Sequence, residues 1–444
     1  MENYRCLGLF VLSALLLRAS VATATVTEVS PGDDLRAAIA ALTPGDELVL
    51  TAGVYEFNSR FNITVLGTAS QPIVIRGKAG DDVLIQMNTG SQNILEVQGS
   101  SYLKLKNLRF RGGSHGIRLM DSDFITIENC EIFETGDVGI SANAGGTYEG
   151  LVIRHNHIHH TSGTGEGMYL GCNNNACRVA NSLIEGNLVH DTNGPSVLQG
   201  DGIELKEGSY GNIIRDNVIH DTNYPGIICY STVGNGPANI VEGNLIWNTN
   251  DNGIQCAADA VIRNNIVLGA PIALQTHQSG SPSNMVVAHN TVIANGSGIN
   301  VRDVSGPVVI ANNAVYSRSG TAINLISGNK SLVTVVGNVG TGGISGTSTG
   351  YTEGNGIVAD FVNGHYNGAP PIDLFPSTDS ALIGAGSTIY VTSVDFNGTP
   401  RNGVADAGAY AYQPGGNPGW VLAAAYKMIA AVLVPNPPTN LASD

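Results

Sequence analysis

One short pattern of apolar and polar residues recurs along the middle of the chain. Apolar or β-branched residues alternate with variable ones, an Asn follows, and a second apolar pair comes after it. The Asn residues of this pattern are Asn129, Asn156, Asn187, Asn217, Asn244, Asn265, Asn290 and Asn313. Successive members lie 27, 31, 30, 27, 21, 25 and 23 positions apart. This period is typical of the coils of a parallel β-helix, whose rungs stack about 4.8 Å apart.

The pattern begins near residue 73 and continues to about residue 340. It predicts an all-β fold, a single-stranded right-handed parallel β-helix. A single rung cannot bury its apolar face, whereas stacked rungs enclose a continuous core. We interpret the Asn residues as a structural ladder of side-chain hydrogen bonds along the stack. A second column, His159, His190, His220 and Trp247, is interpreted as stacked exterior rings and not as a metal site.

The two ends of the chain differ from the repeat. Arg5 precedes an apolar run over residues 7–17, and Ala22-Thr23-Ala24 fits a cleavage site, so residues 1–24 are predicted to be a signal peptide. Residues 33–41 have the pattern of an amphipathic helix that would cap the first rung. We expect one β-helix domain with its caps over residues 25–412, followed by a Pro/Gly-rich tail or linker over residues 413–444.

Composition restricts the partners of the protein. The formal net charge is −15, which disfavours a nucleic-acid partner because the chain lacks the basic excess that phosphate contacts need. No stretch after the signal peptide is long enough to span a membrane. Charged residues make up 13% of the chain against about 25% in typical domains, in keeping with a turn-rich repeat. We expect a monomer, secreted or periplasmic, that contacts neither nucleic acid nor membrane.

The cysteines are compatible with export. Cys172 and Cys177 flank a short loop, and we predict a disulfide between them. Cys229 and Cys256 occupy the same repeat position on consecutive rungs, so they are either bonded or small core residues.

The second strand of each rung begins with Gly-apolar-x-apolar-x, and its alternation separates core residues from outward ones. The predicted outward columns hold Arg118, Asn143, Tyr169, Glu204, Lys206, Tyr230, Gln255, Gln275, Asn300 and Arg302. This long polar and aromatic face is typical of a groove that binds a polymer.

Lys206 and Tyr169 stand out on this face because they occupy neighbouring rungs and the longest loops flank them. Loops on a solenoid usually rise on its binding face. We predict that the two side chains are exposed and reach one sugar residue. The alternative for Lys206 is an exposed ion pair with Glu204 or Glu207, worth about 0–1 kcal/mol.

Two resemblances to known families follow from these residues. Residues 45–55 and 72–77 resemble the first coils of pectin-lyase-like proteins, and residues 380–386, 395–401 and 406–410 resemble the closing segment of many secreted β-helix proteins. Tyr169 in Glu-Gly-Met-Tyr-Leu and Lys206 in Asp-Gly-Ile-Glu-Leu-Lys resemble polysaccharide lyase family 31, alginate lyases that cleave poly-mannuronate with a Tyr and a Lys on adjacent rungs. Family 6 lyases instead pair a Lys with a later Arg, and no Arg stands on the rung after Lys206.

The family 31 resemblance implies β-elimination on an acidic, uronate-containing polysaccharide. Either Lys206 is the base and Tyr169 the acid, or Tyr169 does both while Lys206 stabilises the enolate. The charge of Glu204 counts against Lys206 as base. No cofactor is expected, and nothing in the sequence indicates calcium. The predicted substrate contacts are Arg118, Asn143, Asn173, Glu204, Tyr230, Gln255, His277 and Arg302.

Three other functions remain open on sequence grounds. A uronan C5-epimerase would use the same proton abstraction, and a non-catalytic carbohydrate-binding β-helix would need only the groove. A glycoside hydrolase needs two carboxyl groups at a suitable separation, for which Asp201 and Glu204 are the nearby pair.

Overall fold

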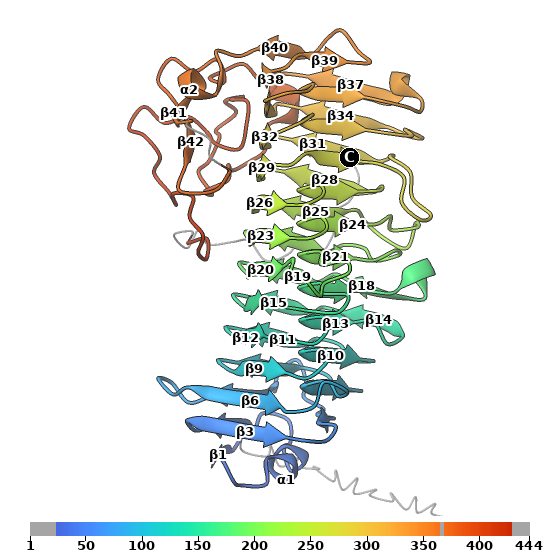
Figure 1. Cartoon of the computed structure of the whole chain (residues 1–444), viewed down its shortest axis with the longest axis vertical. Coiled ribbons are helices and arrows are strands. Elements are labelled where there is room, and N and C mark those ends of the chain that lie inside the picture. The colour runs from blue at the N-terminus through green and yellow to red at the C-terminus, as the bar shows by residue number, and fades with distance from the viewer. Residues whose placement is uncertain (1–23, 365–367, 429–444) are drawn as a thin grey trace, which may run out of the picture.

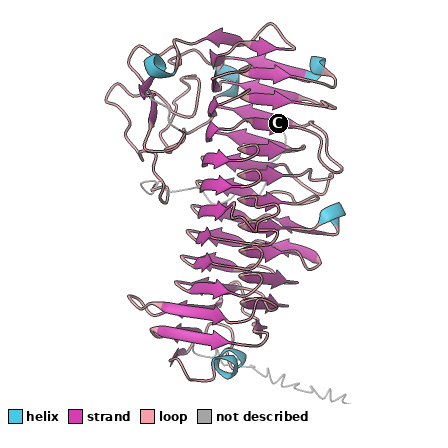
Figure 2. Ribbon diagram, in the orientation of Figure 1, coloured by secondary structure: helices cyan, strands magenta, loops and turns pink. Residues whose placement is uncertain are grey.

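The computed structural model describes residues 24–364 and 368–428, and it is built from three long parallel sheets. They hold 13, 13 and 12 strands and run the length of the solenoid that Figures 1 and 2 show from the side. Each coil visits the sheets in turn, so strands that are neighbours in a sheet come from consecutive coils. The predicted parallel β-helix is confirmed.

The strands of each sheet follow one another along the axis. The first sheet contains β1 (Val26–Val29), β2 (Glu47–Leu50), β5 (Ile73–Gly77), β8 (Leu103–Lys106), β11 (Thr126–Glu128), β15 (Val152–Arg154), β19 (Leu183–Glu185), β22 (Ile213–Arg215), β25 (Asn239–Glu242), β28 (Ala260–Arg263), β31 (Met285–Ala288), β34 (Val308–Ala311) and β37 (Val333–Val336). The second contains β3 (Gly53–Phe57), β6 (Val83–Met87), β9 (Arg109–Gly112), β12 (Glu131–Phe133), β16 (His157–His159), β20 (Leu188–Thr192), β23 (Val218–Thr222), β26 (Leu245–Thr249), β29 (Ile266–Gly269), β32 (Thr291–Ala294), β35 (Ala314–Ser317), β38 (Asn338–Thr341) and β40 (Tyr351–Glu353).

The third sheet, which carries the predicted groove, contains β4 (Asn62–Ile63), β7 (Leu95–Gln98), β10 (Ile117–Met120), β13 (Ile140–Ala142), β17 (Met168–Leu170), β21 (Ile203–Leu205), β24 (Ile227–Cys229), β27 (Ile254–Cys256), β30 (Ile272–Leu274), β33 (Ile299–Val301), β36 (Ile323–Leu325) and β39 (Ile344–Ser345). The remaining elements are the parallel pair β14 (Gly146–Glu149) and β18 (Cys177–Ala180), the antiparallel pair β41 (Phe361–Asn363) and β42 (Asp373–Pro376), the helices α1 (Leu35–Ala40) and α2 (Ile357–Asp360), and the 3₁₀ turns η1 (Asn173–Asn175), η2 (Lys330–Leu332) and η3 (Thr388–Tyr390).

The Asn ladder lies at the turn between the first and second sheets and is fully buried. From Asn156 to Asn313, each side-chain amide donates to the Oδ1 of the next Asn at 2.8–3.0 Å. The ladder ends at Asn338, which the repeat pattern did not include. The prediction for Asn129 is wrong, because Cys130 occupies the ladder position and donates its backbone N–H to Asn156. Asn129 precedes it with a positive φ of 52°, a conformation that Asn tolerates.

The N-terminal cap is confirmed. Helix α1 begins after Asp34, whose carboxylate accepts a hydrogen bond from the Ala37 N–H at 3.0 Å. Leu35 and Ile39 are buried and belong to the same core cluster as the first rungs. The helix lies across the N-terminal end of the stack in Figure 1 and covers its open edge.

Residues 357–364 and 368–428, here called the C-terminal segment, pack against the outer face of the second sheet. Figure 1 shows this segment alongside the upper rungs. Phe375, Phe396 and Tyr410 join outward residues such as Leu268 and Tyr316 in a second apolar cluster. Residues 413–428, which we expected to be tail or linker, belong to this packed segment, since Leu422 is buried in the cluster. Residues 429–444 and most of the predicted signal peptide lie outside the described residues.

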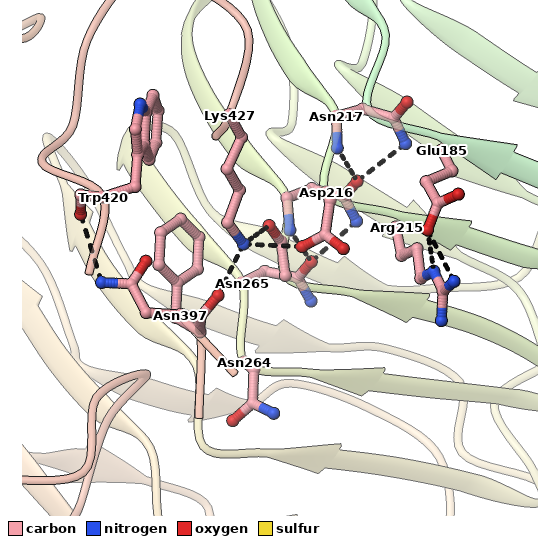
Figure 3. Close-up of polar contacts among 12 residues, drawn as sticks. Glu185, Arg215, Asp216, Asn217, Asn264, Asn265, Asn397, Trp420 and Lys427 are labelled. Atoms are coloured by element: carbon pink, nitrogen blue, oxygen red, sulfur yellow. Dashed lines mark hydrogen bonds and ion pairs between the residues drawn. The ribbon is translucent and has the colours of Figure 1, made fainter. Parts of the chain in front are cut away.

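Lys427 fixes the end of this segment to the solenoid (Figure 3). Its ammonium group donates to Asp216 Oδ1 at 2.7 Å and to the carbonyl oxygens of Gly243 and Phe396 at 2.7 and 2.6 Å. Burial lowers the pKa of Lys427 and raises that of Asp216, so desolvation opposes the charge on both partners. Within the described residues, no helix is long and apolar enough to cross a membrane.

We expect Lys427→Met to destabilise the docked C-terminal segment by about 3 kcal/mol, because Asp216 would lose its buried cation. Hydrogen exchange should quicken in residues 395–428 while the Asn ladder stays protected. Lys78→Met is the matched control, since it breaks an exposed ion pair with Glu28 and should have little effect. Adding Asp216→Asn to Lys427→Met should restore part of the protection. Unchanged exchange in Lys427→Met would contradict this role.

Candidate active site on the third sheet

Tyr169 and Lys206 lie on adjacent rungs of the third sheet. Tyr169, in β17, is the register partner of Glu204 in β21, and both side chains point out of the core. Lys206 follows β21 directly, and its backbone N–H donates to the Leu170 carbonyl at 2.8 Å. The alternation of the strands therefore places the two side chains on one outward face, as predicted.

The ammonium group of Lys206 is the centre of a polar cluster. It donates to Glu204 Oε1 at 2.6 Å and to the Tyr230 hydroxyl at 3.2 Å. It also lies 4.8 and 4.6 Å from the ring centroids of Tyr169 and Tyr230, a cation–π arrangement. Nε2 of His277 lies 3.3 Å from the Tyr230 hydroxyl oxygen. Five of the predicted site residues thus lie together.

The cluster is more buried than we predicted. The side chains of Lys206 and Glu204 are only 4% and 2% exposed. The predictions of an exposed lysine and of an exposed ion pair are therefore both wrong. A buried pair is sensitive to loss of one partner, because the other charge is left without compensation. Tyr169 is half-buried, and within the described part of the chain its hydroxyl makes no hydrogen bond.

Two loops cover the cluster and are joined to each other. The predicted disulfide between Cys172 and Cys177 is confirmed and encloses the turn η1. Glu207 accepts hydrogen bonds from the backbone N–H groups of Asn174 at 2.7 Å and Ser279 at 2.9 Å. A further bond runs from Gln278 Nε2 to Asn173 Oδ1 at 3.2 Å. The disulfide loop beside Lys206 is thereby joined by hydrogen bonds to the loop that carries His277. Cys229 and Cys256 are free, buried core residues.

Three buried carboxyl groups lie close together around Glu204. Glu166, Asp201 and Glu204 each place one oxygen within 4.8 Å of the others. Burial, followed by the charge of Glu204, raises the pKa of Asp201 well above its usual value, and burial raises the pKa of Glu166. One oxygen of each has no hydrogen-bond partner among the described residues. The raised pKa values of Asp201 and Glu166 favour protonated carboxyl groups at these two positions.

These carboxyl groups affect Tyr169. Burial raises the pKa of its phenol, and the charges of Glu204, Glu166 and Asp201 raise it further. Tyr169 therefore keeps its proton at neutral pH. Burial and the charge of Lys206 lower the pKa of His277, which is neutral under the same conditions.

Two family comparisons cover most of the chain. Residues 18–168 match the family described as Pel9A-like, right handed beta helix region. Residues 95–265 and 180–339 match the family described as right handed beta helix region, and together they span more than half of the 444 residues. The chain belongs to the right-handed β-helix family.

The relatives of this right-handed β-helix protein are distant. Pectate lyase PEL9 of Emericella nidulans is 26% identical over 124 residues, which cover 24% of the chain and only 30% of the relative's length. The solved pectate lyase Pel9A has a TM-score of 0.50 at 15% identity, with 89% of this chain and 98% of that chain covered. The alginate lyase of Paenibacillus sp. str. FPU-7 has a TM-score of 0.45 at 22% identity, with 74% and 98% covered. The Pel9A likeness shows a shared fold, and it confirms the pectin-lyase-like resemblance.

The other predicted substrate contacts of the right-handed β-helix protein lie along the third sheet and its loops, at different distances from the Lys206 cluster. Arg118 is two register steps from Tyr169, with Ser141 between them. Asn173 lies within the disulfide loop, and the Asn143 carbonyl oxygen lies 3.4 Å from Cys172 Sγ. Gln255 is buried and accepts hydrogen bonds from Asn252 and Gln275. Arg302 is exposed after β33, four strands beyond β21, and so does not belong to the Lys206 cluster.

On sequence grounds Glu166 had no predicted role, Glu207 was considered only as an ion-pair partner of Lys206, and Asp201 only as part of a hydrolase pair. Glu166 and Asp201 both stand immediately before the Gly that opens an outward strand. Aligning the rungs one position earlier would have placed these two acids side by side. No comparable signal exists for Glu207, because its partners lie in two loops that the repeat does not place.

Proposed function

We propose that the protein is a secreted polysaccharide lyase that cleaves a uronate polymer, with poly-mannuronate as the preferred substrate, by β-elimination. The observation that carries the proposal is the contact of the Lys206 ammonium group with the Tyr169 ring, beside a phenol that keeps its proton. The fungal relative is named a pectate lyase, and pectate is a uronate polymer. The preference for poly-mannuronate rests on the resemblance of the Tyr169 and Lys206 segments to family 31 lyases.

In this mechanism Tyr169 is the acid. β-Elimination removes the proton on C5 of the uronate, forms the C4–C5 double bond and breaks the bond between C4 and the glycosidic oxygen. The leaving oxygen needs a proton, and Tyr169 has one to give. Lys206 then returns a proton to the phenolate, whose ring it contacts. No proton is gained or lost over the cycle.

Lys206 is the base in this assignment. Its ammonium group must first lose a proton, and Glu204 Oε1, 2.6 Å from Nζ, is the acceptor. The negative charge of Glu204 favours the ammonium form, so this first transfer is unfavourable, as the sequence already indicated. The neutral amine takes the proton from C5 and later gives it to the Tyr169 phenolate. Glu204 then returns its proton to the amine, which restores the starting state.

The test is a substrate screen of the full-length protein against poly-mannuronate, poly-guluronate, pectate, glucuronan and chondroitin. A lyase produces an unsaturated uronate that absorbs in the ultraviolet, and we expect this signal to grow first with poly-mannuronate. New reducing ends without ultraviolet absorbance would indicate a hydrolase. Deuterium at C5 without chain cleavage would indicate an epimerase. Binding without any product would leave a carbohydrate-binding protein, and each of these three outcomes would overturn the proposal.

A further inference from the structure

A cluster of histidines lies on the second sheet, away from the groove. The stacked column is confirmed: the rings of His159 and His190 are 5.2 Å apart, those of His190 and His220 are 4.8 Å apart, and Trp247 follows at 4.2 Å. All three contacts are near-parallel, with interplanar angles of 6°, 3° and 15°. Ring stacking therefore explains this column.

Stacking does not explain His157. Its ring is tilted by 42° to that of His190 and presents Nε2 to His190 Nε2 at 2.7 Å. Its Nδ1 lies 3.8 Å from Glu131 Oε1, and His159 Nε2 lies 3.2 Å from the same oxygen. Glu131 and His157 are register partners, and so are His159 and His190. Three potential ligands from two consecutive rungs, Glu131, His157 and His159, thus bring one donor atom each within 4.8 Å of the others.

The neighbours of the cluster hold the rings in orientations that suit metal binding. Asp191 Oδ2 accepts a hydrogen bond from His190 Nδ1 at 2.7 Å, so His190 Nε2 can accept the N–H of His157 Nε2 and leave His157 Nδ1 as the donor atom that faces Glu131. His159 Nδ1 contacts His160 Nδ1 at 2.6 Å, so Nε2 can be the donor atom there too. Metal-binding histidines commonly donate their second ring N–H in this way. Arg109 binds the other oxygen of Glu131 and fixes its carboxylate.

We propose that Glu131, His157 and His159 bind a divalent transition-metal ion of the zinc class, with water in the fourth position. Imidazole nitrogens and one carboxylate form a donor set that Zn²⁺ accepts in a tetrahedral arrangement. Glu131 and His157 also line a cavity of about 530 Å³, which provides a path for the ion. The ion would link two rungs beside Tyr426, whose ring contacts that of His157, away from the Lys206 cluster on the third sheet.

The experiment is a calorimetric titration of the full-length protein with ZnCl₂ near neutral pH, after removal of any polyhistidine tag and treatment with a chelator. We expect one saturable site. His159→Phe keeps an aromatic ring in the stack, as Phe133 does one rung earlier, and should weaken zinc binding by about 100-fold or more. Asp191→Asn should weaken it by about 10-fold, since an outer hydrogen bond is lost.

His155→Asn is the matched control, because His155 lines the same cavity without joining the cluster. Its zinc affinity should equal that of the parent. Co²⁺ gives a second readout: its visible absorption should show a tetrahedral site in the parent and in His155→Asn, and lose that signature in His157→Gln. If His159→Phe does not fold, Asp191→Asn and His157→Gln still decide the result. Equal zinc affinity in the parent and in the cluster variants would overturn the proposal.

Discussion

Tyr169→Phe should lose most of the elimination activity while the protein keeps its thermal midpoint. The substitution removes only a hydroxyl that makes no hydrogen bond within the described residues, so packing and the cation–π contact with Lys206 remain. Loss of a general acid typically costs 10²–10⁴-fold in rate. The measurement is kcat/KM on the most reactive uronate polymer, with the thermal midpoint recorded alongside.

Lys206→Ala should lose activity to a similar degree, but its effect on stability differs. Glu204 is 2% exposed at its side chain and would be left without its cation, so the thermal midpoint should fall. The combination Lys206→Met with Glu204→Gln removes both charges and should recover stability without recovering activity. This pair of variants separates a catalytic lysine from one that only holds the fold.

The control for these changes is Arg302→Ala, which alters an exposed residue four strands away from the cluster. It should leave the thermal midpoint unchanged and reduce the rate far less than Tyr169→Phe. Because residues that act in one step are not additive, Tyr169→Phe combined with Lys206→Met and Glu204→Gln should be little slower than the slowest component. Elimination near the parent rate in Tyr169→Phe would remove the acid from the proposed mechanism.

The pairing of Tyr169 with Lys206 could be predicted from the sequence because it depends on two regular features. Strand alternation determines which side chains leave the core, and the rung repeat determines which strands are neighbours. Both are visible in the spacing of the Gly-apolar segments. The burial of Lys206 depends instead on loops without a repeat, above all the loop of His277, which lies 71 residues after Lys206. The sequence therefore predicts that the Lys206 side chain points out of the core, but it does not predict the loops that bury this side chain.

The error at Asn129 has a similar cause. Asn occurs both in the ladder and at the preceding position, where the backbone has a positive φ, as at Asn264 and Asn312. Where both positions are Asn, the pattern always includes the ladder residue. In the coil of Asn129 only the first of the two is Asn, because the ladder position is Cys130. The ladder therefore begins at Asn156. From there to Asn313, each side-chain amide donates a hydrogen bond to the next Asn along the axis.

The largest expected loss of stability comes from a substitution in the Asn ladder. Asn217 Oδ1 accepts from both the backbone N–H and the side-chain amide of Asn187 at 2.9 Å. Its own amide donates to Ile184 O and Asn244 Oδ1 at 3.0 Å. Asn217→Ala would interrupt this chain in the middle of the stack and leave the Asn187 N–H buried without its acceptor. Each such unsatisfied group costs about 1–3 kcal/mol.

We therefore expect Asn217→Ala to lower the free energy of unfolding by about 4 kcal/mol, measured by chemical denaturation. Asn250→Ala is the matched control, because Asn250 is exposed and makes one long side-chain hydrogen bond to Asn223, at 3.5 Å. It should change stability by no more than about 0.5 kcal/mol. Since each rung of a solenoid contacts only its neighbours, hydrogen exchange in Asn217→Ala should quicken first around Asn187 and Asn244. Equal stability of the two variants would show that strand pairing and core packing hold the stack without the ladder.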